Sequence, residues 1–119
     1  MSQSWPSSSP RAFRVHCYQT EDTTVVECHG KLTLENASLL KSEAKSLIGQ
    51  KKRIVLDLRE VPLMDSAGLA VITELYASAQ LKEKEFELVN ANKQVRELFS
   101  ISKLLTLFEA AGHHSAKIT

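Results

Sequence analysis

The chain has 119 residues, of which 43% are hydrophobic and 24% are charged, and its formal net charge is +1. This composition is ordinary for one folded domain, and nothing in the near-neutral charge favours an electrostatically driven nucleic-acid or membrane surface. No apolar run approaches the ~20 residues that span a bilayer, and the N-terminus lacks the basic and apolar regions of a signal peptide. The sequence therefore predicts a cytoplasmic protein.

The first residues predict a tail. Five serines and two prolines fall within residues 1–12, and such a composition cannot bury much surface. We expect a disordered tail over residues 1–12, a single domain over 13–110 and a C-terminal tail over 111–119. Trp5, the only tryptophan, has two interpretations that the sequence leaves open: it docks on the domain, or it is exposed in the tail.

A β-hairpin is predicted at the start of the domain. Apolar and polar side chains alternate over residues 13–19 and again over 24–30. The segment Thr20-Glu21-Asp22-Thr23 between them is typical of a turn.

The hairpin brings two pairs of reactive side chains together. If its turn is centred near Asp22, Cys17 and Cys28 lie opposite one another on the inward face, and His16 and His29 pair on the outward face. We expect reduced core cysteines, with a redox pair as the alternative, because cytosolic thiols stay reduced. The histidines are expected to be solvated, since two ligands without a third make a weak metal site. With no Gly-rich phosphate loop either, we expect no metal and no cofactor.

Helices alternate with strands in the rest of the chain. An apolar-periodic segment predicts the first helix, with Thr33 as a plausible cap and Gly49 as its C-terminal stop. The branched and nearly continuous run Ile54–Leu58 predicts a strand buried on both faces. Asp65-Ser66 then stands directly before a second apolar-periodic segment, which predicts a helix over about residues 66–82.

The last elements complete an alternating order. They are a strand over residues 85–90, a helix capped by Asn92 and a short strand over Leu104–Glu109. The order is β-β-α-β-α-β-α-β, and crossover connections between parallel strands are right-handed. The sequence therefore predicts an α/β fold with a mixed, mostly parallel sheet, an N-terminal β-hairpin and crossover helices. The first strand should run antiparallel to its neighbour at an edge.

Ser66 and Asp57 are the residues where chemistry could reside. A serine hydrolase needs a base, and no histidine stands near Ser66 and no nucleophile elbow surrounds it. Asp57 superficially resembles the phosphate-accepting residue of a receiver domain. That family, however, places an acidic pair at the end of a parallel strand, whereas Glu21-Asp22 lie in a hairpin turn. We expect Asp57 to have a hydrogen-bonding role near a strand end.

Three stretches resemble one family, over nearly the whole chain from about Phe13 to Phe108. Gly30-Lys31-Leu32-Thr33 resembles the Gly-x-Leu-Asp element of the STAS domain. Ile54–Leu58 followed by Met64–Leu69 resembles that family's central strand and its Asp-Ser-Ser/Thr-Gly-Leu loop. Val89-Asn90 followed by Val95–Phe99 resembles its fourth strand and third helix. The resemblance is to stand-alone STAS proteins, the bacterial anti-sigma factor antagonists, and it implies the STAS fold.

The resemblance implies a binding protein and not an enzyme. Its partners would be an anti-sigma factor that is also a GHKL-type serine kinase, and a serine phosphatase. Phosphorylation of Ser66 would end binding to the anti-sigma factor. The implied partner-binding residues are Asp65, Ser66, Ala67, Gly68, Leu69, Thr33, Leu34 and Asn36. Two departures stand out: Ala67 replaces the second hydroxyl residue of the loop, which leaves Ser66 as its only acceptor, and Thr33 replaces the usual Asp.

Two other functions stay open. One is a constitutive STAS scaffold or subunit in a stress-signalling or lipid ABC transport assembly. The other is a small enzyme that uses Asp65 and Ser66. We expect neither nucleic acid nor a membrane as a partner, and we expect a monomer or a weak homodimer, since the hairpin face that carries Tyr18 could form an edge contact.

Overall fold

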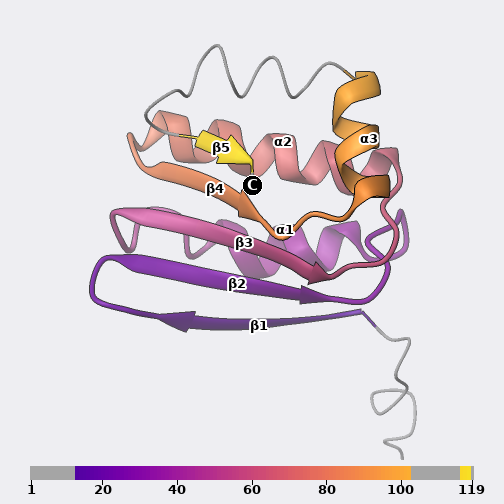
Figure 1. The fold of residues 1–119 in the computed structure, drawn as a ribbon. Coiled ribbons are helices and arrows are strands. Elements are labelled where there is room, and N and C mark those ends of the chain that lie inside the picture. The colour runs from indigo at the N-terminus through magenta and orange to yellow at the C-terminus, as the bar shows by residue number, and fades with distance from the viewer. Residues whose placement is uncertain (1–12, 103–115, 119) are drawn as a thin grey trace, which may run out of the picture.

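One sheet and three helices make up the described part of the computed structural model, residues 13–102 and 116–118. The elements are β1 Arg14–Gln19, β2 Thr23–His29, α1 Ala37–Lys45, β3 Arg53–Glu60, α2 Ser66–Leu81, β4 Glu85–Val89, α3 Lys93–Ser102 and β5 Ala116–Ile118. Figure 1 shows α1 and α2 behind the sheet, and α3 at the end toward which β2, β3 and β4 point.

The order of the strands follows the chain. The sheet reads β1-β2-β3-β4-β5, with β1 antiparallel to β2 and every other neighbouring pair parallel. The predicted α/β fold, with a mostly parallel sheet and the first strand at an edge, is confirmed. The C-terminal part differs. The strand predicted over Leu104–Glu109 lies outside the described residues, and the strand beside β4 is Ala116–Ile118, a segment expected in the C-terminal tail.

The register of the hairpin corrects the expected side-chain pairs. Neither Cys17 and Cys28 nor His16 and His29 lie opposite one another. The turn is centred between Glu21 and Asp22, and this position displaces every cross-strand partner by two residues from the expected one. The pairs that form are Cys17–Val26, Val15–Cys28, His16–Glu27 and Arg14–His29.

The helices cover only one face of the sheet in the described part of the chain. On β3, Ile54, Leu56 and Leu58 are buried against the helices, whereas Val55 and Asp57 on the other face are half-buried. The prediction of a strand buried on both faces was therefore wrong. Because the parallel strands follow one another in a single direction, right-handed crossovers place their helices on the same side. No helix within the described ranges is both long and apolar enough to cross a membrane.

Burial makes both thiols poor nucleophiles. Cys28 is 1% exposed, and burial, with smaller contributions from Cys17 and Asp57, raises the pKa of its thiol to about 12. Burial and the charge of Glu43 also raise the pKa of Cys17. Since the thiolate is the reactive form of cysteine, these shifts favour reduced core residues over a redox pair.

Alkylation tests that assignment. We expect iodoacetamide at pH 8 to label Cys17 slowly in the folded protein and Cys28 only after unfolding in urea, because a raised pKa removes thiolate at this pH. Mass analysis of the two cysteine peptides over time measures both rates. Labelling of Cys28 in the folded protein at the rate of a free thiol would contradict its burial.

Candidate functional site

The loop Val61–Asp65 joins β3 to α2 at the end of the sheet toward which three parallel strands point (Figure 1). The loop between β2 and α1 lies beside it. The N–H of Leu32 donates to the carbonyl of Leu63 at 3.0 Å, and the carbonyl of Leu32 accepts from the N–H of Asp65 at 3.2 Å. These bonds form a short parallel bridge between Leu32 and Met64. Two backbone hydrogen bonds therefore connect the two loops that carry the predicted site.

Asp65 caps α2 and ties the neighbouring loop to it. Its Oδ1 accepts from the N–H of Ala67 at 2.9 Å and of Gly68 at 3.1 Å, while its Oδ2 accepts from the N–H of Leu34 at 3.1 Å. A carboxylate here also interacts favourably with the helix dipole. The predicted helix start at Asp65-Ser66 is confirmed, with Asp65 as the cap and Ser66 as the first residue of the helix.

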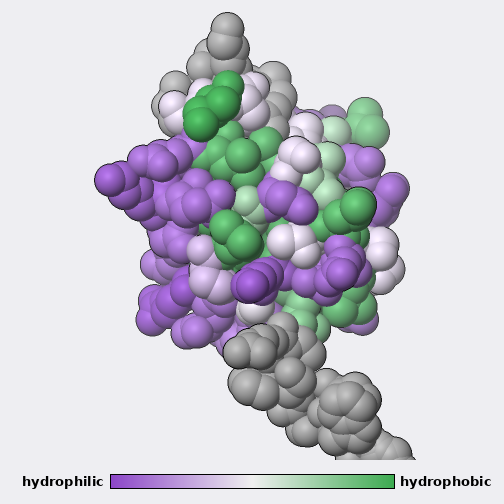
Figure 2. All heavy atoms as spheres, turned by 90° about the vertical axis from the view of Figure 1, so that its right-hand side faces the viewer, coloured by the Kyte–Doolittle hydropathy of each residue, from purple (hydrophilic) through white to green (hydrophobic). Residues whose placement is uncertain are grey.

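Ser66 is exposed, and each of the two loops beside it carries an exposed leucine. Its hydroxyl makes no hydrogen bond to any residue that the structure describes. Close to it in the two loops, the side chains of Leu34 and Leu63 are 77% and 40% exposed. Figure 2 views this end of the molecule and shows hydrophobic side chains in its centre and on its right, with hydrophilic ones among them and on the left. Leu63 is absent from the residues expected from sequence, because a single leucine after a proline carries no local signal of exposure.

Gly68 and Leu69 belong to the interior. Leu69 is 6% exposed, and Gly68 is buried against Leu32 and Met64. Of the residues implied as partner-binding, these two therefore support the surface from beneath. Asp65 and Ala67 are half-buried, which leaves Ser66 as the exposed member of the helix start.

Replacement of Gly68 by alanine should destabilise the fold. A Cβ at Gly68 would lie 2.6 Å from the carbonyl oxygen of Leu32 and 2.9 Å from Cγ of Met64. Alanine gains up to about 1 kcal/mol in helix propensity, but the backbone of the neighbouring loop would have to move, and overpacking costs about 1–3 kcal/mol. We expect urea unfolding to show that the free energy of unfolding falls by about 1 kcal/mol. An unchanged or raised urea midpoint would contradict this close contact.

Thr33 and Asn36 form a turn before α1. The helix begins at Ala37 and not near Thr33, so the expected cap was wrong. The backbone carbonyl of Thr33 accepts from the N–H groups of Asn36 at 2.8 Å and of Ala37 at 2.9 Å. The side-chain amide of Asn36 donates to the carbonyl of Lys31 at 2.6 Å. These bonds shape the loop that exposes Leu34.

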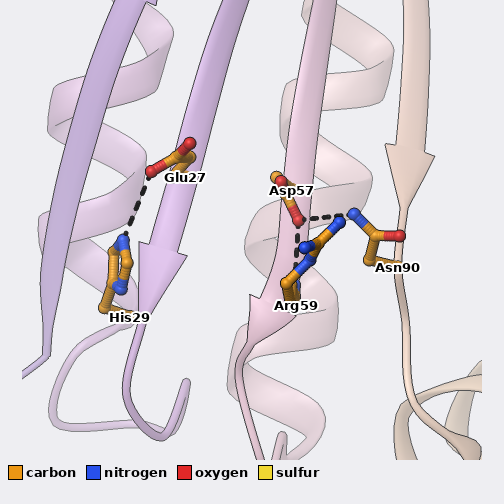
Figure 3. A network of polar contacts seen from close by, with 5 residues as sticks. All are labelled: Glu27, His29, Asp57, Arg59 and Asn90. Atoms are coloured by element: carbon orange, nitrogen blue, oxygen red, sulfur yellow. Dashed lines mark hydrogen bonds and ion pairs between the residues drawn. The ribbon is translucent and has the colours of Figure 1, made fainter.

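Asp57 lies apart from this site, on the open face of the sheet (Figure 3). Its Oδ1 accepts from the backbone N–H of Arg59 and from the side-chain amide of Asn90, both at 3.0 Å, which confirms the expected hydrogen-bonding role. Asp57 lies within β3, three residues before its end at Glu60, and not at the strand end. The receiver-domain alternative fails on geometry. The carbonyl of Asp22 accepts from the N–H of Arg53, the first residue of β3, so the acidic turn lies at the N-terminal end of β3, four residues before Asp57.

The histidines are also outside the loop site. On the same open face as Asp57, His29 Nε2 lies 3.5 Å from Glu27 Oε1 (Figure 3). His16 faces Glu27 across the β1–β2 pair. Neither histidine reaches Ser66, so the chain offers no imidazole base for a serine hydrolase within its described residues.

Comparison with known proteins decides the family. A model of the STAS domain matches residues 14–116. The chain belongs to the STAS domain family. This STAS protein is 33% identical over 99 residues to BtrV of Bordetella bronchiseptica, described as an anti-sigma factor antagonist, and the match covers 80% of this chain and 84% of BtrV.

Solved structures share the STAS fold. TM1081 of Thermotoga maritima, described as an anti-sigma factor antagonist, superposes with a TM-score of 0.73 at 25% identity, covering 87% of this chain and 84% of that one. Unphosphorylated SpoIIAA, an anti-sigma factor antagonist of Bacillus, gives a TM-score of 0.68 at 19% identity, covering 91% and 88%. The STAS resemblance seen in the sequence is confirmed.

Proposed function

We propose that this STAS protein is a cytoplasmic anti-sigma factor antagonist that binds its anti-sigma factor through the surface around Ser66. Phosphorylation of Ser66 by that partner, a GHKL-type serine kinase, ends the binding, and a serine phosphatase reverses the modification. The protein acts by binding and not by catalysis. The observation that carries the proposal is one unbonded, exposed serine at the start of α2, with the exposed Leu34 and Leu63 close to it.

The geometry favours a switch that leaves the fold intact. Asp65 Oδ1 already accepts hydrogen bonds from the N–H groups of Ala67 and Gly68. Because these donors are occupied, a phosphate on Ser66 would project from the surface. It would add about −1.5 to −2 charges at neutral pH beside the carboxylate of Asp65. A dianion tolerated by the helix N-terminus is costly to bury under a partner, because like charges repel and the phosphate must lose its water.

Phosphorylation itself is tested by mass analysis. The chain is incubated with ATP and each GHKL-type serine kinase of its host, and the peptide containing Ser66 is analysed. We expect phosphate on Ser66 and none in the Ser66→Ala variant, while Ser46→Ala, at the far end of α1, keeps full incorporation. Phosphate found only elsewhere, or in none of these reactions, would count against the switch and favour a constitutive scaffold.

Leu34 is expected to anchor the partner. Its side chain is 77% exposed, so Leu34→Ser should leave the stability of the free protein within about 0.5 kcal/mol. We expect the loss of this apolar side chain from the interface to weaken binding about tenfold, or about 1.4 kcal/mol. Calorimetric titration with the purified anti-sigma factor measures the effect. Leu81→Ser, at the other end of α2 and 86% exposed, is the matched control, and equal affinities for the two variants would place the interface elsewhere.

A further inference from the structure

We infer that Asn92 and Gln94, at the start of α3, are positioning residues that hold the loop Val61–Asp65 in the conformation that presents Ser66. The inference rests on the proposed function of that loop. Neither amide is near Ser66 in sequence, and each acts through backbone groups of residues that precede it.

Gln94 pairs with both backbone groups of Met64. Its Oε1 accepts from the N–H of Met64 at 3.0 Å, and its Nε2 donates to the carbonyl of Met64 at 3.1 Å. A side-chain amide carries one acceptor and a donor in a fixed plane, so it reproduces the two bonds that a neighbouring strand would make. Met64 is 2% exposed, which means that water cannot readily replace the amide.

Asn92 holds the preceding residues and also caps α3. Its Nδ2 donates to the carbonyls of Val61 and Pro62, both at 3.2 Å. Its Oδ1 accepts from the N–H of Val95 at 2.9 Å, which confirms the helix cap predicted from sequence. One side chain therefore couples the first turn of α3 to the first half of the loop.

The loop is consequently bound along its whole length. On the side of α1, the backbone of Leu32 bonds to Leu63 and Asp65. On the side of α3, the described residues supply no strand, because β4 ends at Val89. The two amides supply the missing partners, and together the two sides hold a backbone group of every residue from Val61 to Asp65.

This arrangement has a consequence for Ser66. The loop directly precedes α2, so its path sets the direction in which the Leu63 side chain and the Ser66 hydroxyl point. Without Gln94, a buried N–H and a buried carbonyl lose their partners, and such a loop opens to regain water. The acceptor hydroxyl would then spend less time in the geometry that phosphoryl transfer requires.

Hydrogen exchange and kinase kinetics test the inference on Gln94→Ala, with Gln50→Ala at the opposite end of the sheet as the matched control. We expect the Met64 amide to exchange about tenfold faster in Gln94→Ala than in wild type, with no such change in the control. Phosphorylation of Ser66 by the GHKL-type kinase should lose about tenfold in kcat with KM little changed, because a misplaced acceptor weakens the transition state more than substrate binding. Wild-type exchange at Met64 together with wild-type kcat would overturn the inference.

A second variant keeps the test decisive if Gln94→Ala does not fold. In Gln94→Glu, a neutral carboxyl offers the donor and acceptor of an amide, whereas the carboxylate offers only acceptors. Exchange at the loop amides of Gln94→Glu should therefore match wild type near pH 4 and exceed it near pH 7.5, after correction for the intrinsic rate. A constant ratio to wild type at both pH values would overturn the inference. If the wild-type chain is not phosphorylated by any kinase, the proposed function fails, but the exchange data still decide whether the amides hold the loop.

Discussion

Ser66→Asp is expected to bind the anti-sigma factor about 150-fold more weakly than the wild-type chain, since a loss of roughly 3 kcal/mol corresponds to that factor. Ser66 is exposed at the first position of α2, and its neighbour Asp65 already carries a negative charge. A second carboxylate would have to be buried under the partner next to the first. Calorimetric titration of both chains with the purified anti-sigma factor measures the ratio.

Two controls separate charge at the site from charge elsewhere. Ser66→Ala should bind like wild type, because the hydroxyl makes no hydrogen bond within the described structure that its removal would break. Ser46→Asp adds the same charge beyond the C-terminus of α1 and should change the affinity less than twofold. Wild-type affinity in Ser66→Asp would mean that charge at this position does not control binding.

Asp65→Ala is expected to lower the free energy of unfolding by about 3 kcal/mol, because it removes a helix cap and a charged acceptor together. The carboxylate of Asp65 binds the N–H groups of Ala67, Gly68 and Leu34. Urea unfolding followed by circular dichroism measures the loss. The variant should also bind the anti-sigma factor more weakly, since the loop that exposes Leu34 is no longer tied to α2.

Asp65→Asn distinguishes capping from charge. The amide oxygen can still accept from the N–H groups of Ala67 and Gly68, but no second acceptor is left for Leu34. We expect less than half the destabilisation of Asp65→Ala. A change below about 0.5 kcal/mol in Asp65→Ala itself would show that these bonds contribute little, against the usual cost of removing a cap.

Much of the fold could be predicted from local sequence signals. Capping residues followed by apolar periodicity predict the starts of two helices, α2 after Asp65 and α3 after Asn92. The edge position of β1 follows from the short hairpin turn. These features depend on neighbours within one or two turns of chain, and local chemistry is sufficient to specify them.

The corrected features depend on contacts between distant residues. A helix capped by Thr33 would include Leu34, yet Leu34 lies exposed in the loop before α1, where its N–H donates to Asp65, 31 residues away. The amide of Gln94 reaches Met64 across 30 residues. The pattern of apolar residues within a single segment cannot predict hydrogen bonds between residues so far apart in the sequence. The predicted hairpin register was wrong for another reason. When the turn centre is misplaced by one residue, every residue is paired with a cross-strand partner two residues away from the correct one.

The affinity of the anti-sigma factor for the chain before and after phosphorylation tests the central claim most directly. The chain phosphorylated on Ser66 and the same chain treated with a serine phosphatase are titrated with the anti-sigma factor in one calorimetric series. We predict at least about 150-fold weaker binding by the phosphorylated chain, because the phosphate adds more charge than Ser66→Asp does, and full recovery after dephosphorylation. Equal affinity of the two forms, with phosphate on Ser66 verified by mass analysis, would contradict the switch.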